Sequence, residues 1–219
     1  MILLAIDTSG SGCYAAIHDS DTDRPLGTAG EVIGRGHAER LMDFIDQALD
    51  NAGMEMTAID RIAVTVGPGS FTGIRVGVAA ARGLSLALCV PAVGVSTLAA
   101  LAAAHLREHP GAPVFVAMDA KRGEAYCQAF SVNGEPAGEA TVLSIDDART
   151  RAARVGGTVI GSAAPLLSGA EAAGPPDAVS IDIVARLGAI ADPQTARPKP
   201  FYLRGPDAKP QAGFAIARA

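Results

Sequence analysis

The sequence carries Leu3-Leu4-Ala5-Ile6-Asp7 near its start and Phe115-Val116-Ala117-Met118-Asp119 just past its middle. In both places the apolar run ends in Asp, a turn containing Gly follows, and a Tyr comes seven residues after the Asp. Each run indicates a buried strand, and the turn at its end can point backbone N–H groups and a carboxylate at a phosphate and its metal ion. Two strand ends can carry Asp by chance, but the matching flanks favour an internal duplication. The sequence therefore predicts two similar lobes with a cleft between them.

Strands and helices alternate along the rest of the chain, which is typical of an α/β fold. Apolar residues spaced three and four apart predict the helices, and turn residues bound them. The predicted helices cover residues 37–51, 72–88, 96–107, 145–153 and 181–191. We expect a first lobe over residues 1–109 and a shortened second lobe over residues 110–219, whose end is Pro-rich and irregular.

The composition narrows the class of protein. The 219 residues include 23 acidic and 18 basic side chains, for a net charge of −5. Because holding a polyanion needs a positive surface, we expect the chain not to bind RNA unaided. Three widely spaced cysteines indicate buried thiols in a reducing compartment. The first residues lack the basic lead-in of a signal peptide, and the longest apolar run, residues 84–95, is too short to cross a bilayer, so we expect a cytoplasmic protein without membrane contact.

The most distinctive segment is Gly67-Pro68-Gly69-Ser70-Phe71-Thr72-Gly73, which joins a predicted strand to a predicted helix. Proline fixes one φ angle and the glycines permit positive φ, so the chain can turn sharply, and Ser70 or Thr72 can cap the helix. The free N–H groups of that helix end could hold an anion. However, a Walker-type phosphate loop needs a Lys before the Ser or Thr, and this segment has none. A tight structural turn is therefore favoured, with a phosphate site as the alternative.

Small residues recur at every fourth position of the next helix, at Gly73, Gly77 and Ala81, with Leu84 beside them. Such a row makes a flat groove in which another helix can lie close. Packing inside this chain accounts for one face of the helix. Because apolar residues spread around its axis, we expect a second face to need a partner subunit. We expect the groove along Gly73, Gly77 and Ala81, with Leu84, to form that interface.

A histidine pair matches one zinc-peptidase pattern, H-x-x-E-H, at residues 105–109. Two histidines four residues apart can share a metal ion on one helix face. This pair lies just before Pro110-Gly111, and nothing supplies a third ligand or a walled pocket. We interpret the pair as a polar helix end.

The chain is basic from Pro193 onward, where five cations oppose one acid. They are Arg197, Lys199, Arg204, Lys209 and Arg218, against Asp207. The usual explanation is solvated, flexible chain. Contact with an acidic partner or with RNA is the alternative.

Five segments of the sequence resemble the TsaB (YeaZ-like) family, a branch of the actin, Hsp70 and sugar-kinase superfamily of ATPases. The segments are Leu4-Ala5-Ile6-Asp7-Thr8-Ser9, Gly67 to Arg75, Gly94-Val95-Ser96-Thr97-Leu98, Asp119 to Glu124, and Phe201-Tyr202-Leu203-Arg204. They span nearly the whole chain in the family's order, and the G-P-G-S-F-T-G-I-R run is the most specific. The resemblance implies a two-lobed, ribonuclease H-like duplicated fold with a shortened second lobe.

The resemblance also implies a non-catalytic subunit. TsaB-like proteins pair with the catalytic paralogue TsaD and work with the ATPase TsaE. Their complex transfers a threonylcarbamoyl group to N6 of adenosine 37 in tRNAs that read codons beginning with A. Pairing through the helices at residues 37–51 and 72–88 adds Leu41 and Ile45 to the expected interface. The chain is expected to meet tRNA only through the complex, and can form a homodimer when alone.

The chemistry is expected to lie on the partner subunits. TsaD-like proteins hold a metal ion with an H-x-x-x-H motif, and those positions fall here near Thr97 and Leu101, which are not good ligands. The nucleotide-site residues Asp7, Thr8, Ser9 and Asp119 are therefore expected to be vestigial. We expect no cofactor on this chain alone, with ATP and a metal ion on the partners.

Two alternative functions remain open. One is a free-standing, ATP-dependent phosphotransferase of the same fold, with Asp7 and Asp119 around Mg²⁺. The other is a metallopeptidase, which would hold zinc or iron.

Overall fold

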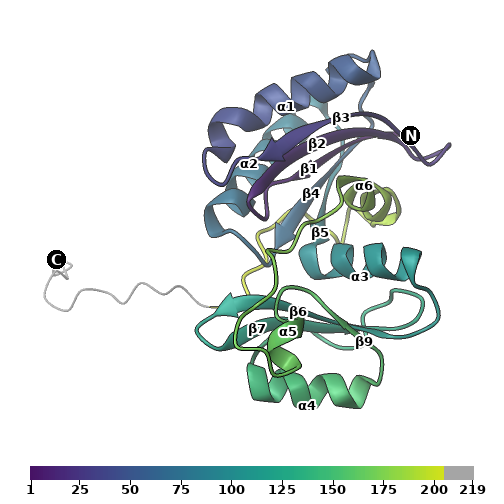
Figure 1. The fold of residues 1–219 in the computed structure, drawn as a ribbon. Coiled ribbons are helices and arrows are strands. Elements are labelled where there is room, and N and C mark those ends of the chain that lie inside the picture. The colour runs from purple at the N-terminus through teal and green to yellow at the C-terminus, as the bar shows by residue number, and fades with distance from the viewer. Residues whose placement is uncertain (205–219) are drawn as a thin grey trace, which may run out of the picture.

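The computed structural model describes residues 1–204, which form two β-sheets with helices around and between them (Figure 1). The first sheet has the strand order β3-β2-β1-β4-β5, and the second has the order β8-β7-β6-β9. The strands are β1 (Ile2–Asp7), β2 (Gly12–Asp19), β3 (Arg24–Val32), β4 (Arg61–Gly67), β5 (Ala92–Ser96), β6 (Val114–Lys121), β7 (Glu124–Phe130), β8 (Thr141–Ser144) and β9 (Thr158–Ile160). The helices are α1 (His37–Ala52), a 3₁₀ turn η1 (Met56–Ala58), α2 (Phe71–Leu88), α3 (Thr97–Glu108), α4 (Ile145–Val155), α5 (Ala164–Leu167) and α6 (Ile181–Ile190).

The two sheets repeat one topology. In the first, β1 pairs antiparallel with β2 and parallel with β4; in the second, β6 pairs antiparallel with β7 and parallel with β9. The order β3-β2-β1-β4 thus corresponds to β8-β7-β6-β9, and within residues 1–204 the second sheet has no counterpart of β5. The predicted α/β fold, with two similar halves and a shorter second sheet, is confirmed.

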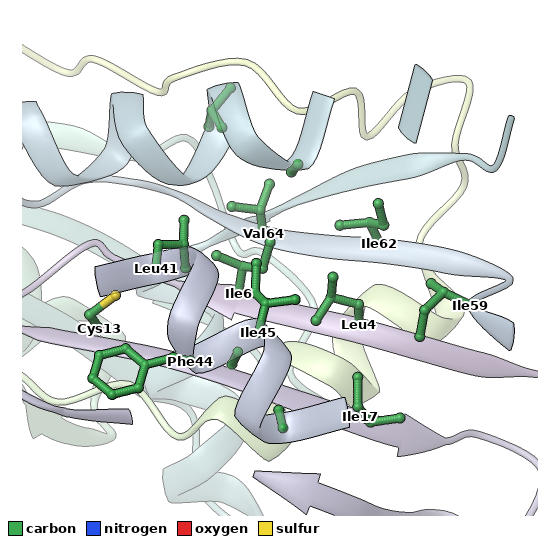
Figure 2. Packing of buried hydrophobic residues seen from close by; sticks show 14 of the residues in the cluster. Leu4, Ile6, Cys13, Ile17, Leu41, Phe44, Ile45, Ile59, Ile62 and Val64 are labelled. Atoms are coloured by element: carbon green, nitrogen blue, oxygen red, sulfur yellow. The ribbon is translucent and has the colours of Figure 1, made fainter. Parts of the chain in front are cut away.

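Helices α1 and α2 cover one face of the first sheet and enclose the largest hydrophobic cluster. Leu4, Ile6 and Val64 of the strands pack under Leu41 and Ile45 of α1 (Figure 2). Leu41 is 1% exposed and Ile45 is fully buried. The prediction that these two side chains contact a partner is therefore wrong, because the amphipathic helix turns its apolar face to its own sheet.

The row of small residues on α2 also faces inward. A Cβ on Gly73 would lie 2.0 Å from the carbonyl oxygen of Thr8, and one on Gly77 would lie 2.4 Å from Thr8 Oγ1. Ala81 is fully buried, and Leu84 packs against the same cluster. The predicted partner groove along these residues is wrong, because the row makes room for the loop after β1 of the same chain.

Length and composition alone would let α2 cross a membrane, since its mean hydropathy is 1.3. In the structure the helix begins at the glycine-rich turn and buries Ile74 and Val78 against the first sheet. Its outer side stays exposed, so residues 1–204 leave part of this apolar helix uncovered.

Helices α3 and α6 lie between the two sheets (Figure 1). Leu98 of α3 packs on the second sheet against Val116. Val184 of α6 packs instead on the first sheet, against Ala63. The sequence placed the last helix in the second lobe, but in the structure it returns to the first, because the alanines of β1, β2 and β4 leave space for it.

Two polar contacts fix α6 on the first sheet. Arg61 Nη1 donates hydrogen bonds to three carbonyl oxygens at the C-terminal end of α6, over 3.1, 2.9 and 3.0 Å. His18 of β2 is 1% exposed, and its Nε2 lies 3.4 Å from Asp23 Oδ1. Arg186 of α6 forms an ion pair with the same carboxylate. Burial lowers the pKa of His18, and the guanidinium of Arg186 lowers it further, so the folded state holds a neutral imidazole.

The glycine row gives a stability prediction. We expect Gly77→Ala to lower the free energy of unfolding by about 1–3 kcal/mol, because the new methyl group overpacks the contact with Thr8. The matched control is Gly83→Ala on the same helix, where a Cβ would meet nothing within 4 Å. That control should be neutral or stabilising by up to about 1 kcal/mol. Urea unfolding measures both, and equal effects would contradict the inward orientation of the row.

His18 gives a prediction about pH. The unfolded chain takes up the proton near the ordinary pKa of about 6.5, whereas the folded chain resists it until lower pH. Stability should therefore be complete above about pH 6.5 and fall as the pH drops below it. His18→Gln should flatten this slope in urea unfolding between about pH 7.5 and 5.5, while His109→Gln at the exposed end of α3 should keep it. An unchanged slope in His18→Gln would show that the buried imidazole is not its source.

Candidate functional site: the cleft between the sheets

The loop after β1 and the end of β6 face each other across a cavity of about 270 Å³. Ser9, Gly10 and Ser11 line it from the first loop, and Met118, Asp119 and Lys121 line it from the second half. Thr97, Ser162, Gly174, Pro176 and Asp177 complete the wall. The two copies of the duplicated hairpin thus meet at one cleft.

Asp7 stands behind this cavity and serves as a structural carboxylate. It is 4% exposed, and its Oδ1 accepts hydrogen bonds from Ser9 N at 3.0 Å, Ser9 Oγ at 2.7 Å and Thr65 Oγ1 at 2.6 Å. Thr8 is fully buried and donates from Oγ1 to the carbonyl of Gly73 at 2.8 Å. These bonds hold the first loop in place and occupy one of the two carboxylate oxygens of Asp7.

Asp119 is the more open of the two duplicated carboxylates. Its Oδ1 accepts from the Lys121 backbone N–H at 2.8 Å, and its Oδ2 accepts from Lys121 Nζ at 2.6 Å. Burial works to raise the pKa of Asp119, but the hydrogen bonds and charge of Lys121 outweigh it and lower that pKa below its ordinary value. Asp119 is therefore ionised and already paired.

Ser162 and Asp177 belong to the site but were not anticipated from the sequence. Ser162 Oγ accepts from the Asp119 backbone N–H at 2.8 Å and donates to Asp177 Oδ2. Burial, together with the nearby charge of Asp119, raises the pKa of Asp177 despite the hydrogen bonds from Ser162. Both residues lie in loops after β9, where no periodic pattern or motif marks them.

The glycine-rich turn supports the first loop from behind and does not line the cavity. Ser70 N donates to the Ser9 carbonyl at 2.7 Å, and Ser70 Oγ caps α2 by accepting from Gly73 N at 3.2 Å. Gly69 is required because a Cβ there would lie 2.2 Å from the Ser9 carbonyl oxygen. Gly67 has a positive φ of 104°, and Pro68 follows it in the turn. Thr72 is exposed. The favoured interpretation as a tight structural turn fits this arrangement.

The residues present do not fit the metal site of the family. Thr97, at one of the expected ligand positions, lines the cavity, but its Oγ1 is a buried neutral hydroxyl without a hydrogen-bond partner among the described residues. Leu101, at the other, packs in the cluster between α3 and the second sheet. Residues 1–204 contain no group of three or more His, Cys, Asp or Glu side chains that could hold a metal ion. The rings of His105 and His109 lie 4.9 Å apart, at the end of α3.

Comparison with known proteins agrees with this geometry. The family model described as "TsaD: tRNA N6-adenosine threonylcarbamoyltransferase" matches residues 14–173. The tRNA threonylcarbamoyladenosine biosynthesis protein TsaB of Escherichia coli is 36% identical over 126 residues, which cover 58% of this chain and 53% of that protein. The match thus spans about half the length of this curated relative. An uncharacterised protein of Mycobacterium tuberculosis is 33% identical over 210 residues, covering 96% of this chain and 95% of its own.

A solved structure extends the likeness over nearly the whole molecule. YeaZ from Pseudomonas aeruginosa is 30% identical, with a TM-score of 0.72 over 92% of this chain and 99% of that one. The chain therefore belongs to the TsaD family and, within it, to the TsaB or YeaZ-like proteins of the actin-like ATPase superfamily.

Proposed function

We propose that this chain is the supporting subunit of an assembly that makes threonylcarbamoyladenosine in tRNA, where it binds a TsaD-like catalytic subunit. The observation that carries the proposal is the match to TsaB and TsaD proteins, combined with a cleft in which Asp119 is already paired with Lys121 and Asp7 holds the first loop. In this proposal the chain performs no chemistry, while a TsaE-like ATPase, ATP and the metal ion belong to its partners. The match to proteins of tRNA modification favours this function over a free phosphotransferase or a metallopeptidase.

The outward face of α1 and α2 is the proposed partner surface, in place of the inward row of small residues. Leu86 on α2 is 81% exposed and Met42 on α1 is 44% exposed, so two large apolar side chains lie uncovered. The outer side of α1 also carries exposed acids, whereas α2 carries the exposed Arg82 and contains no acid. Acidic and basic helices side by side suit a paralogous partner, or a second copy, packed in the opposite sense.

The surface prediction uses Leu86. We expect Leu86→Asp to weaken binding to the TsaD-like subunit by about tenfold or more, because it places a charge in an apolar contact. Isothermal titration calorimetry with the purified subunit measures this. Val132→Asp is the matched control, since Val132 is 46% exposed at the end of β7, away from α1 and α2. Equal affinities for both variants would place the partner surface elsewhere.

The cleft gives a second prediction. We expect Asp119→Asn to support tRNA modification in a reconstituted reaction about as well as the wild-type chain, within roughly twofold, because the proposed role needs no chemistry from this carboxylate. The isolated chain should show no ATP turnover with Mg²⁺. Turnover that Asp119→Asn abolishes would instead support the phosphotransferase, and stoichiometric zinc or iron in the purified protein would support the peptidase.

A further inference from the structure

Charge is strongly segregated in this acidic chain. Residues 61–107 contain four arginines and no aspartate or glutamate, and residues 193–204 contain Arg197, Lys199 and Arg204 and no acid. The two segments lie against each other. The Gly94 N–H donates to the Ala196 carbonyl at 2.7 Å, and the Phe201 N–H donates to the Val66 carbonyl at 2.8 Å. Two segments without acidic residues therefore adjoin in a chain whose net charge is −5.

An exposed aromatic and cationic stack stands where these segments meet. The ring centroids of Phe71 and Tyr202 lie 5.3 Å apart, and the Arg75 guanidinium carbon lies 3.6 Å from the Phe71 centroid. Arg75 Nε donates to Tyr202 Oη at 2.8 Å. Phe71 is 51% exposed and Tyr202 is 45% exposed. The contacts hold two flat rings and one flat guanidinium in place while leaving about half of each ring open to solvent.

The stack continues along the chain segment that precedes it. Arg197, Lys199 and Phe201 are exposed, while Pro198 and Pro200 between them are half-buried. This alternation is that of an extended chain, whose side chains point to opposite sides in turn. Within residues 1–204, no carboxylate lies within ion-pair distance of Arg75, Arg197 or Lys199, whereas Arg204 is paired with Glu124 and bonds the Ala120 carbonyl. Arg197, Lys199 and Phe201 thus point to one side of this segment, and the exposed Tyr202 next to them joins the segment to Arg75 of α2. Arg204 anchors the segment to the second sheet.

We propose that this basic aromatic strip, formed by Phe71, Arg75, Arg197, Lys199, Phe201 and Tyr202, binds a single-stranded segment of RNA. Unpaired bases stack on exposed aromatic rings and on guanidinium planes, and the backbone phosphates meet the cations. An acidic protein segment would use the cations but would leave the flat ring faces without a matching partner. Given the proposed function, the RNA is an unpaired loop of the tRNA, bound while this chain sits in its complex. The negative charge elsewhere on the chain explains why the strip needs that complex for tight binding.

The test measures tRNA affinity of the assembled complex with the TsaD-like subunit, using the double variant Arg197→Glu, Lys199→Glu. Both side chains are exposed, so the fold should persist. We expect an affinity loss of about tenfold or more and a salt slope shallower by about 1–2, because two phosphate contacts disappear. The matched control, Arg24→Glu with Arg154→Glu, makes the same charge change at exposed positions on β3 and α4 and should keep wild-type affinity.

Two further readouts separate RNA from other partners. Ultraviolet crosslinking of the wild-type complex to tRNA, followed by mass spectrometry, should attach nucleotides to Phe71, Phe201 or Tyr202. Calorimetry should show unchanged affinity of the double variant for the TsaD-like subunit. The inference is overturned if the double variant binds tRNA like the control, or if its tRNA loss merely follows lost binding to the subunit. If only the RNA inference fails, the wild-type complex still forms and still modifies tRNA. If the wild-type complex fails to form or to modify tRNA, the proposed function itself is contradicted.

Discussion

The hydrogen bonds to Asp7 Oδ1 are the constraint on which the rest of the structure depends. Ser9 and Thr65 donate three bonds to this one oxygen, which locks the loop after β1 to the end of β4. Once the loop is fixed there, α2 can approach it only with glycine at positions 69, 73 and 77. The most distinctive motif of the sequence is therefore a consequence of this carboxylate. Asp7 does not line the cavity, and these bonds give its Oδ1 a structural role.

The same packing decides which surfaces of the chain the proposed partners can reach. The apolar side of α1 and the small-residue side of α2 are buried in the chain's own core. What remains for partners is the opposite side of the same helices, with Leu86 and Met42 uncovered and charges divided between the two. The segment after α6 then passes beside β5 and β4 and contacts the second sheet through Arg204. This segment meets the helix pair where Tyr202 contacts Phe71 and Arg75 of α2.

The sequence predicted features that depend on neighbouring residues, but not contacts between residues far apart in the chain. The strand–Asp–turn repeat predicted the duplicated sheets, because hairpin geometry is written in neighbouring residues. The glycine row predicted a close approach but not which partner fills it, since spacing alone cannot tell a face buried inside the chain from one that is buried by another subunit. The return of α6 to the first sheet depends on alanines far away in the sequence, and Ser162 and Asp177 lie in loops without periodicity. The sequence predicted a basic tail, and the structure describes three of its cations, Arg197, Lys199 and Arg204. The other two, Lys209 and Arg218, lie outside the described residues.

In the proposed function, this chain is necessary for tRNA modification but performs no chemical step. The most direct measurement is threonylcarbamoyladenosine formation on purified tRNA, reconstituted from the catalytic subunit and the ATPase with this chain present or left out. The account predicts that modification is lost when the chain is omitted and returns in proportion to the chain added, up to one copy per catalytic subunit. Full modification in its absence, or modifying activity in this chain alone, would contradict it.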